Sequence, residues 1–146
     1  MTSYISAELR RLVMARAEHI CEYCLIHEDD TYFGCQVDHV ISEKHGGPTS
    51  EDNLALACTF CNRYKGSDIG SIIWTTNTFV RFYNPRTDNW TEHFELDGMI
   101  IKPRTAIGEV TTRILEFNNA ERLLERETLQ AVGRYPTPEA LARIQT

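Results

Sequence analysis

The sequence lacks several features that would place it in a broad class. No run approaches the roughly 20 apolar residues that a membrane-spanning helix needs, so no membrane partner is expected. The first residues contain neither the basic nor the apolar segment of a secretion signal, and we therefore expect a cytoplasmic protein. Basic residues are in the minority, with 15 Lys and Arg against 21 Asp and Glu. The resulting net charge of −6 speaks against broad nonspecific binding to nucleic acid.

Cysteines are few, but they follow a pattern. There are five, and an odd number without an export signal argues against a disulfide framework. Four of them form two Cys-x-x-Cys pairs, Cys21/Cys24 and Cys58/Cys61. Four thiolates at this spacing satisfy tetrahedral Zn²⁺, so we predict a structural zinc site. A redox role for either pair is the competing interpretation, but neither pair opens a thioredoxin-like βαβ unit. The remaining Cys35 is interpreted as a small buried hydrophobe.

Residues between and just after the two pairs have the chemistry needed to cut a phosphodiester. Such cleavage requires a base that takes a proton from water and a Lewis acid on the phosphate. His39 can be the base, because a neutral imidazole is available at physiological pH. Asp38 and Asn62 offer hard oxygen ligands, which suit Mg²⁺ or Mn²⁺. Asn53 can hydrogen-bond the backbone near His39 and orient the ring.

Three further residues are candidates for contact with the substrate. Arg63 and Lys65 can bind phosphates that flank the cut, and His45, in the His-Gly-Gly segment, is a weaker candidate for the same role. Each has a plainer alternative: the two basic residues could be surface charges, and the histidine an ordinary loop residue. The two asparagines could likewise be helix or segment caps.

The order of Asp38 and His39 raises a geometric question. Consecutive residues on a regular strand point to opposite faces of the sheet. The two side chains can therefore serve one site only if the phosphate lies between them, or if the strand twists or ends there. The Gly- and Pro-containing loop that follows favours a strand that ends at this point.

Together these residues form a pattern that is similar to a known family. It reads Cys21-x2-Cys24, Asp38-His39-Val40-Ile41, His45-Gly46-Gly47, Asp52-Asn53-Leu54 and Cys58-x2-Cys61-Asn62-x2-Lys65-Gly66. Over roughly residues 18–68 it resembles the HNH endonuclease family, which has the ββα-metal fold. The tail resembles that of a bacterial subgroup of this family that includes small cyanobacterial-type members.

The resemblance implies roles for individual residues. His39 would be the general base, Asn53 would orient it, and Asp38 and Asn62 would hold the catalytic Mg²⁺ or Mn²⁺. The last position of the motif is Asn62 rather than His, a substitution that is common in the family and keeps an oxygen ligand. The four cysteines match the structural zinc knuckles of the family.

The predicted fold is α+β, with a ββα-metal core held by a four-cysteine zinc site and a C-terminal β-hairpin and helical extension. We expect residues 1–67 to form the nuclease core and residues 68–146 to pack on it. The local expectations are a helix capped by Ser6, a hairpin of residues 31–35 and 36–41 around Gly34, a strand over 54–57, a helix over 60–65 closed by Gly66, strands over 79–83 and 90–96, a turn at Asp97-Gly98, and helices capped by Thr105, over 120–132 and from Thr137.

The predicted function is a metal-dependent endonuclease that hydrolyses DNA. The alternative is a catalytically inactive module, held by zinc, that only docks on nucleic acid or protein. Because the sequence outside the core offers little basic surface, a homodimer or a protein partner could supply affinity for DNA.

Overall fold

The structure is a computed structural model that describes residues 4–145, which form six α-helices and three two-stranded antiparallel sheets. The α+β class predicted from the sequence is confirmed. Helix α1 (Ala7–Arg16) begins as expected at Ser6, whose hydroxyl accepts a hydrogen bond from the Leu9 amide at 3.1 Å. The helix ends before the first cysteine pair, because Glu18 and His19 adopt positive φ angles that are incompatible with a helix.

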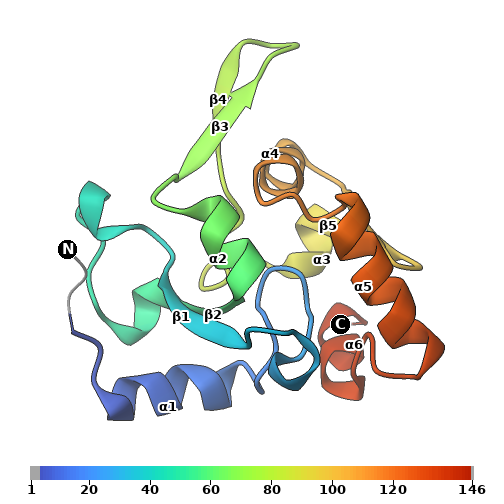
Figure 1. The fold of residues 1–146 in the computed structure, drawn as a ribbon. Coiled ribbons are helices and arrows are strands. Elements are labelled where there is room, and N and C mark those ends of the chain that lie inside the picture. The colour runs from blue at the N-terminus through green and yellow to red at the C-terminus, as the bar shows by residue number, and fades with distance from the viewer. Residues whose placement is uncertain (1–3, 146) are drawn as a thin grey trace.

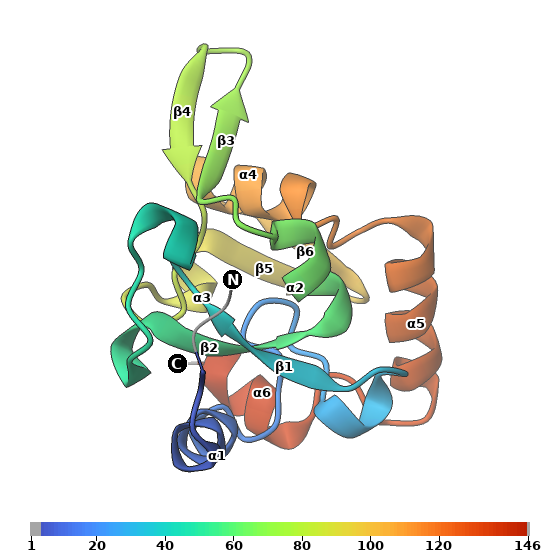
Figure 2. The same cartoon turned by 60° about the vertical axis from the view of Figure 1, so that its left-hand side comes forward.

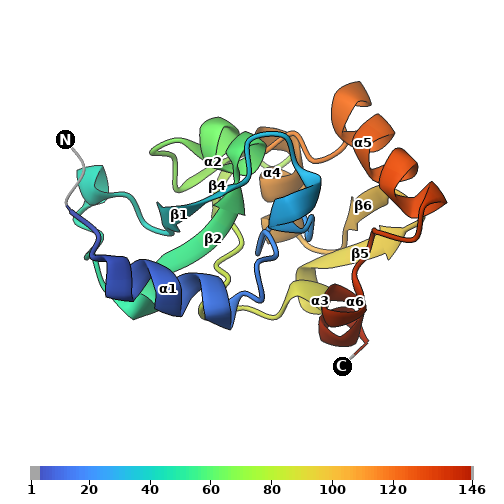
Figure 3. The same ribbon diagram turned by 60° about the horizontal axis from the view of Figure 1, so that its bottom comes forward.

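The centre of the fold is a ββα unit. Strand β1 (Cys35–His39) pairs with β2 (Leu54–Cys58), and helix α2 (Thr59–Lys65) follows β2 directly. Figures 1 and 3 show that this strand pair lies between α1 and α2. Every residue of β2 is buried, and its leucines pack against the apolar face of α1. Gly66 ends α2, as its position in the sequence suggested.

The hairpin predicted around Gly34 is wrong, because β1 pairs with β2 and not with residues 31–35. The register joins Cys35 to Cys58 and His39 to Leu54. The fully apolar β2 needs a partner that covers its backbone groups inside the protein, and β1 is that partner. Tyr32, in contrast, is 89% exposed, so the segment before Gly34 presents no packed face.

The extension consists of two β-hairpins and four helices. Its elements are β3 (Gly70–Ile73), β4 (Thr78–Arg81), α3 (Trp90–His93), β5 (Phe94–Asp97), β6 (Ile100–Pro103), α4 (Ala106–Ile114), α5 (Ala120–Ala131) and α6 (Pro138–Ile144). The turn between β5 and β6 at Asp97-Gly98 is confirmed. The caps of α4 and α6 at Thr105 and Thr137 are confirmed as well, and Asn119 caps α5. The β3–β4 hairpin projects from the rest of the molecule (Figures 1 and 2).

The strand predicted over residues 90–96 is wrong in its first half. Trp90–His93 is a helical turn, and the strand begins only at Phe94. Trp90 and Phe94 are four residues apart, a spacing that satisfies both a strand period of two and a helical turn. Their rings lie 5.1 Å apart, and the indole nitrogen of Trp90 donates a hydrogen bond to the Tyr23 carbonyl at 2.9 Å. Burial of this indole against the first cysteine loop therefore decided between the two conformations.

The hydrophobic core runs through both parts of the chain. One cluster joins buried residues of the ββα region, such as Tyr23, to buried residues of the extension, such as Phe94 and Phe117. The hydroxyl of Tyr135 also donates to the Cys24 carbonyl at 2.8 Å. The boundary near residue 67 between a nuclease core and an extension stays a prediction. Within residues 4–145, no helix is both long and apolar enough to cross a membrane.

Candidate active site and metal centre

The four cysteines of the two Cys-x-x-Cys pairs meet in one buried cluster. Cys21 and Cys24 lie in the loop after α1, Cys58 ends β2 and Cys61 lies on α2. Their sulfur atoms all lie within 4.8 Å of one another, and none forms a disulfide. The donor set is therefore compatible with a tetrahedral Zn²⁺ site. Cys35 is outside the cluster and only half-buried.

A buried arginine of the extension faces this cluster. Arg122, on α5, approaches Cys24 Sγ at 3.1 Å and Cys58 Sγ at 3.6 Å. Its guanidinium lies over the Phe60 ring, 4.9 Å from the centroid. Burial alone would lower the pKa of Arg122, but the nearby thiolates raise it above its ordinary value. A buried cation in this position fits anionic cysteines, which are the form that binds a metal.

The pKa values of the thiols in this cluster shift in different directions. Burial raises the pKa of Cys21 and of Cys61 well above the ordinary thiol value. Burial also acts to raise the pKa of Cys24, but hydrogen bonds with the other thiols and the charge of Arg122 bring it well below that value. The charge of Arg122 therefore favours the thiolate form of Cys24.

Asp38 lies in a second, polar site at the end of β1, on the side that faces α2. Its Oδ2 is 3.1 Å from Lys65 Nζ, and the hydroxyl of Tyr23 donates to the same oxygen at 3.4 Å. Burial raises the pKa of Asp38 above its ordinary value, while Lys65 and Tyr23 act in the opposite direction. Lys65 also donates to the His39 carbonyl at 2.8 Å.

Lys65, for which the sequence predicted a contact with a phosphate that flanks the cut, turns inward. Its side chain is only 1% exposed, and its ammonium group points inward to Asp38. In this arrangement it holds the carboxylate at the end of β1. Arg63, two residues earlier, is exposed, with its guanidinium 5.7 Å from the centroid of the Phe60 ring.

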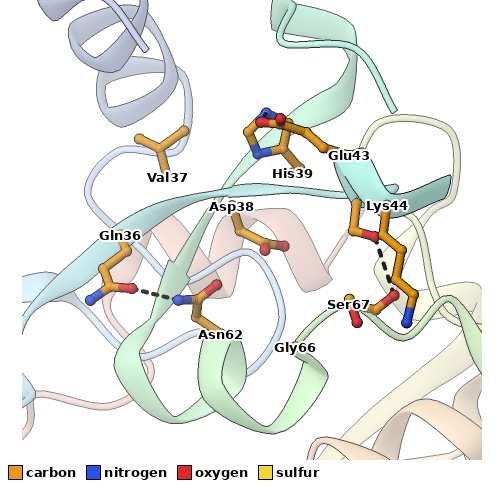
Figure 4. Close-up of a pocket in the computed structure, with 10 residues that line it drawn as sticks. Gln36, Val37, Asp38, His39, Glu43, Lys44, Asn62, Gly66 and Ser67 are labelled. Carbon is orange, nitrogen blue, oxygen red and sulfur yellow. Dashed lines mark hydrogen bonds and ion pairs between the residues drawn. The ribbon is translucent and has the colours of Figure 1, made fainter. Parts of the chain in front are cut away.

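His39 lies on the opposite side of β1 from Asp38, as the alternation of strand residues requires (Figure 4). Its Nε2 is 2.9 Å from Thr49 Oγ1 and 3.2 Å from Glu43 Oε1. Both residues are nevertheless among those that line one pocket of about 440 Å³ at the end of β1. That the two side chains serve one catalytic site stays a prediction.

Asn53 holds the loop that follows β1. Its Oδ1 accepts from the Ile41 amide at 3.0 Å, and its Nδ2 donates to the carbonyls of Ile41 and Pro48. The loop packs so closely here that a Cβ on Gly47 would lie 1.7 Å from the Ile41 carbonyl oxygen. Only glycine fits at this approach. Asn53 therefore acts on the backbone near His39, as its position in the sequence suggested.

Asn62 reaches the pocket from α2. Its Nδ2 donates to Gln36 Oε1 at 2.5 Å, and Figure 4 shows the amide oxygen turned away from Gln36, on the side of Asp38. The carboxylate of Asp38 and the amide oxygen of Asn62 are hard donors that line the same pocket. This donor set fits Mg²⁺ or Mn²⁺.

The remaining candidate, His45, is exposed beside the pocket. Its Nε2 is 3.1 Å from the Ser67 carbonyl oxygen, and Ser67 lines the pocket. The structure thus brings Asp38, His39 and Asn62 to one cavity and places His45 at its edge. The full lining is Gln36, Val37, Asp38, His39, Ser42, Glu43, Lys44, Asn62, Gly66 and Ser67.

The comparison with known families agrees with this geometry. Residues 21–68 match the family model of the HNH endonuclease. Comparisons with curated proteins and with solved structures gave no match. The matched segment contains both cysteine pairs and the whole ββα unit. This segment matches the HNH endonuclease family, and the match supports nuclease activity in general and a nucleic acid as substrate.

Four residues with a part in these sites were not found from the sequence. Glu43 and Thr49 contact the imidazole, Tyr23 contacts Asp38, and Arg122 contacts the cysteines. The two imidazole partners lie in the segment already expected to surround the site. Arg122 gave no signal, because it is one of several charged residues on a helix that reads as an ordinary amphipathic surface helix.

Lys65→Met should lower the free energy of unfolding by about 3–5 kcal/mol, because removing one partner of a buried ion pair leaves the other charge uncompensated. The matched control is Arg63→Met on the exposed face of the same short helix, which should change it by less than about 0.5 kcal/mol. Urea titrations followed by circular dichroism measure both. Equal effects of the two substitutions would contradict the role assigned to Lys65.

Proposed function

We propose that the protein is a metal-dependent endonuclease that hydrolyses DNA phosphodiester bonds. The observation that carries the proposal is the meeting of an imidazole and two hard oxygen donors, from β1 and α2, at one polar pocket. A module that only docks on a partner has no need of this combination. The HNH match over the same residues supports the proposal independently.

In this proposal His39 is the general base. Thr49 Oγ1 and Glu43 Oε1 both contact its Nε2, and the Glu43 carboxylate favours a proton on that nitrogen. The lone pair is then on Nδ1, which takes the proton of the attacking water. The water oxygen forms the new bond to phosphorus and the bond to the 3′ oxygen breaks. That oxygen takes a proton from solvent, and the products carry a 5′-phosphate and a 3′-hydroxyl.

The residues that would hold the catalytic cation are Asp38 and Asn62. A bound Mg²⁺ or Mn²⁺ would polarise the phosphate and offset the charge on the leaving oxygen. Lys65 and Tyr23 keep the Asp38 carboxylate in place, and Gln36 fixes the Asn62 amide so that its oxygen is available. Asn53 keeps the loop after His39 in position, which orients the base.

The charge of the chain bears on how DNA is bound. The net charge of −6 gives little general attraction for a polyanion. Exposed cations near the pocket, Lys44 and Arg63, are candidates for contact with flanking phosphates. A second copy of the chain, or a protein partner, would add affinity that these few cations do not supply.

Zinc in the four-cysteine cluster is the structural part of the proposal, and Arg122 offsets the negative charge of its four thiolates. Arg122→Gln should therefore speed the transfer of zinc to a colorimetric chelator by about 10-fold or more. Arg122→Lys, which keeps the charge, should restore part of the retention. Glu121→Gln, on the exposed side of α5, is the control. The same transfer rate in the Gln variant and in the wild type would contradict this role.

The experiment that tests the function is incubation with supercoiled plasmid DNA. We expect conversion to nicked or linear product with added Mg²⁺ or Mn²⁺ and none when these are omitted. Quantified zinc of one equivalent per chain would exclude the redox interpretation of the cysteine pairs. A protein that holds zinc and binds DNA but does not cut it with any of the added metals would instead be the docking module.

A further inference from the structure

The β3–β4 hairpin has a fixed base and a projecting end. Arg113 of α4 donates to Ser71 Oγ at 3.2 Å and to the Ile72 carbonyl at 2.6 Å, and Ile73, the last residue of β3, is buried. The residues beyond, 74–77, form the turn that points away from the molecule (Figures 1 and 2). The hairpin is thus a firmly attached arm rather than a loose loop.

One face of this arm is apolar and open to solvent. The register pairs Ile72 directly with Phe79, so these two side chains lie on the same side of the arm. Trp74 follows β3 at the start of the turn. Trp74 is 73% exposed and Phe79 is 54% exposed. The Phe79 ring lies over Gly70, where an added Cβ would be 2.6 Å from its Cζ. Two large aromatic side chains held in water on a rigid hairpin indicate a contact surface.

The charge of this segment differs from that of the rest of the chain. No acidic residue occurs between Asp68 and Asp88, whereas the whole chain carries 21 Asp and Glu. Arg113 at the base bonds only uncharged groups among the described residues, so its positive charge is not neutralised. This face has aromatic side chains, no carboxylates and a cation at its base. It therefore suits a ligand that has a negatively charged backbone and flat aromatic rings.

The arm is continuous with the candidate active site. Gly66 and Ser67 line the pocket, and β3 begins at Gly70, three residues later. A strand of four residues spans roughly 13 Å, which is about four nucleotides at roughly 3.4 Å each. A DNA strand that lies in the pocket would therefore reach the arm within a few nucleotides of the cut.

We propose that the β3–β4 hairpin is a nucleic-acid arm on which Trp74 stacks against an unpaired base beside the scissile phosphate. This inference rests on the proposed function and narrows its substrate class to DNA with single-stranded or locally opened bases near the cut. Stacking on an aromatic side chain is available to any base, so the arm adds affinity without strong sequence preference.

The test uses the fluorescence of the two tryptophans, Trp74 on the arm and Trp90, which is only 6% exposed. His39→Ala protein without added Mg²⁺ is titrated with a single-stranded oligonucleotide and with a blunt duplex. We expect the single strand to quench the fluorescence and to protect Trp74 from acrylamide. Trp74→Ala should weaken single-strand binding by about 10-fold, while Trp74→Phe keeps most of it.

The control is Tyr32→Ala, an exposed aromatic residue outside the arm, which should leave binding unchanged. The proposal would be overturned if Trp74→Ala bound the single strand as tightly as the wild type does. It would also be overturned if this variant lost as much affinity for the blunt duplex as for the single strand. Loss of a dimer in the Trp74→Ala variant on size exclusion would assign the arm to a protein contact instead. If the wild-type protein cleaves plasmid DNA, the proposed function stands whatever the result for the arm. If the wild-type protein does not cleave plasmid DNA, the proposal of a nuclease is refuted.

Discussion

Replacing His39 with alanine should lower the rate of DNA cleavage by about 10²- to 10⁴-fold, the usual contribution of a positioned general base. The side chain lines the pocket, and two oxygen atoms, from Thr49 and Glu43, fix its Nε2. Its removal leaves the attacking water without an acceptor for its proton. The measurement is the rate of plasmid conversion at saturating Mg²⁺.

The same variant should keep its fold and its zinc, because the imidazole does not belong to the cysteine cluster. Circular dichroism and zinc quantification check this. His19→Ala is the matched control, since this histidine lies on the surface and pairs with Glu28 away from the pocket. Cleavage at the normal rate by His39→Ala would refute the mechanism.

Cys58→Ser should abolish zinc binding and unfold the core. Cys58 is fully buried, ends β2, and caps α2 by accepting from the Cys61 amide. Zinc supplies on the order of 10 kcal/mol of folding free energy in small zinc domains, which is comparable to the whole stability of an ordinary domain. The loss of one ligand therefore removes most of what holds the ββα unit together. Thermal melts and zinc content measure the effect.

Cys35→Ser is a close control for this prediction. Cys35 lies directly opposite Cys58 in the β1–β2 register, yet it is outside the metal cluster. Burial raises the pKa of its thiol, which favours the neutral form of this side chain. We expect this variant to bind zinc and to melt cooperatively near the wild-type temperature. If both variants unfolded alike, the effect of Cys58→Ser would have to be attributed to packing rather than to zinc.

Several structural features could be read from the residues because they depend on local chemistry. The caps at Ser6, Thr105 and Thr137 are short-range hydrogen bonds, and each helix begins where its cap indicated. The Cys-x-x-Cys spacing likewise brings two sulfurs together within one turn of chain. Where a local signal was ambiguous, as at Trp90 and Phe94, the prediction was only half correct.

The residue types alone establish which donors the two sites can offer: thiolates from four cysteines, hard oxygens from Asp38 and Asn62, and an imidazole from His39. Three contacts emerge only in the folded chain: Lys65 turns inward to Asp38, Arg122 reaches the cysteines from α5, and β1 pairs with β2. The reason is physical. A buried charge must find an opposite charge, and a buried strand must find a partner, and in this chain those partners lie far away in the sequence.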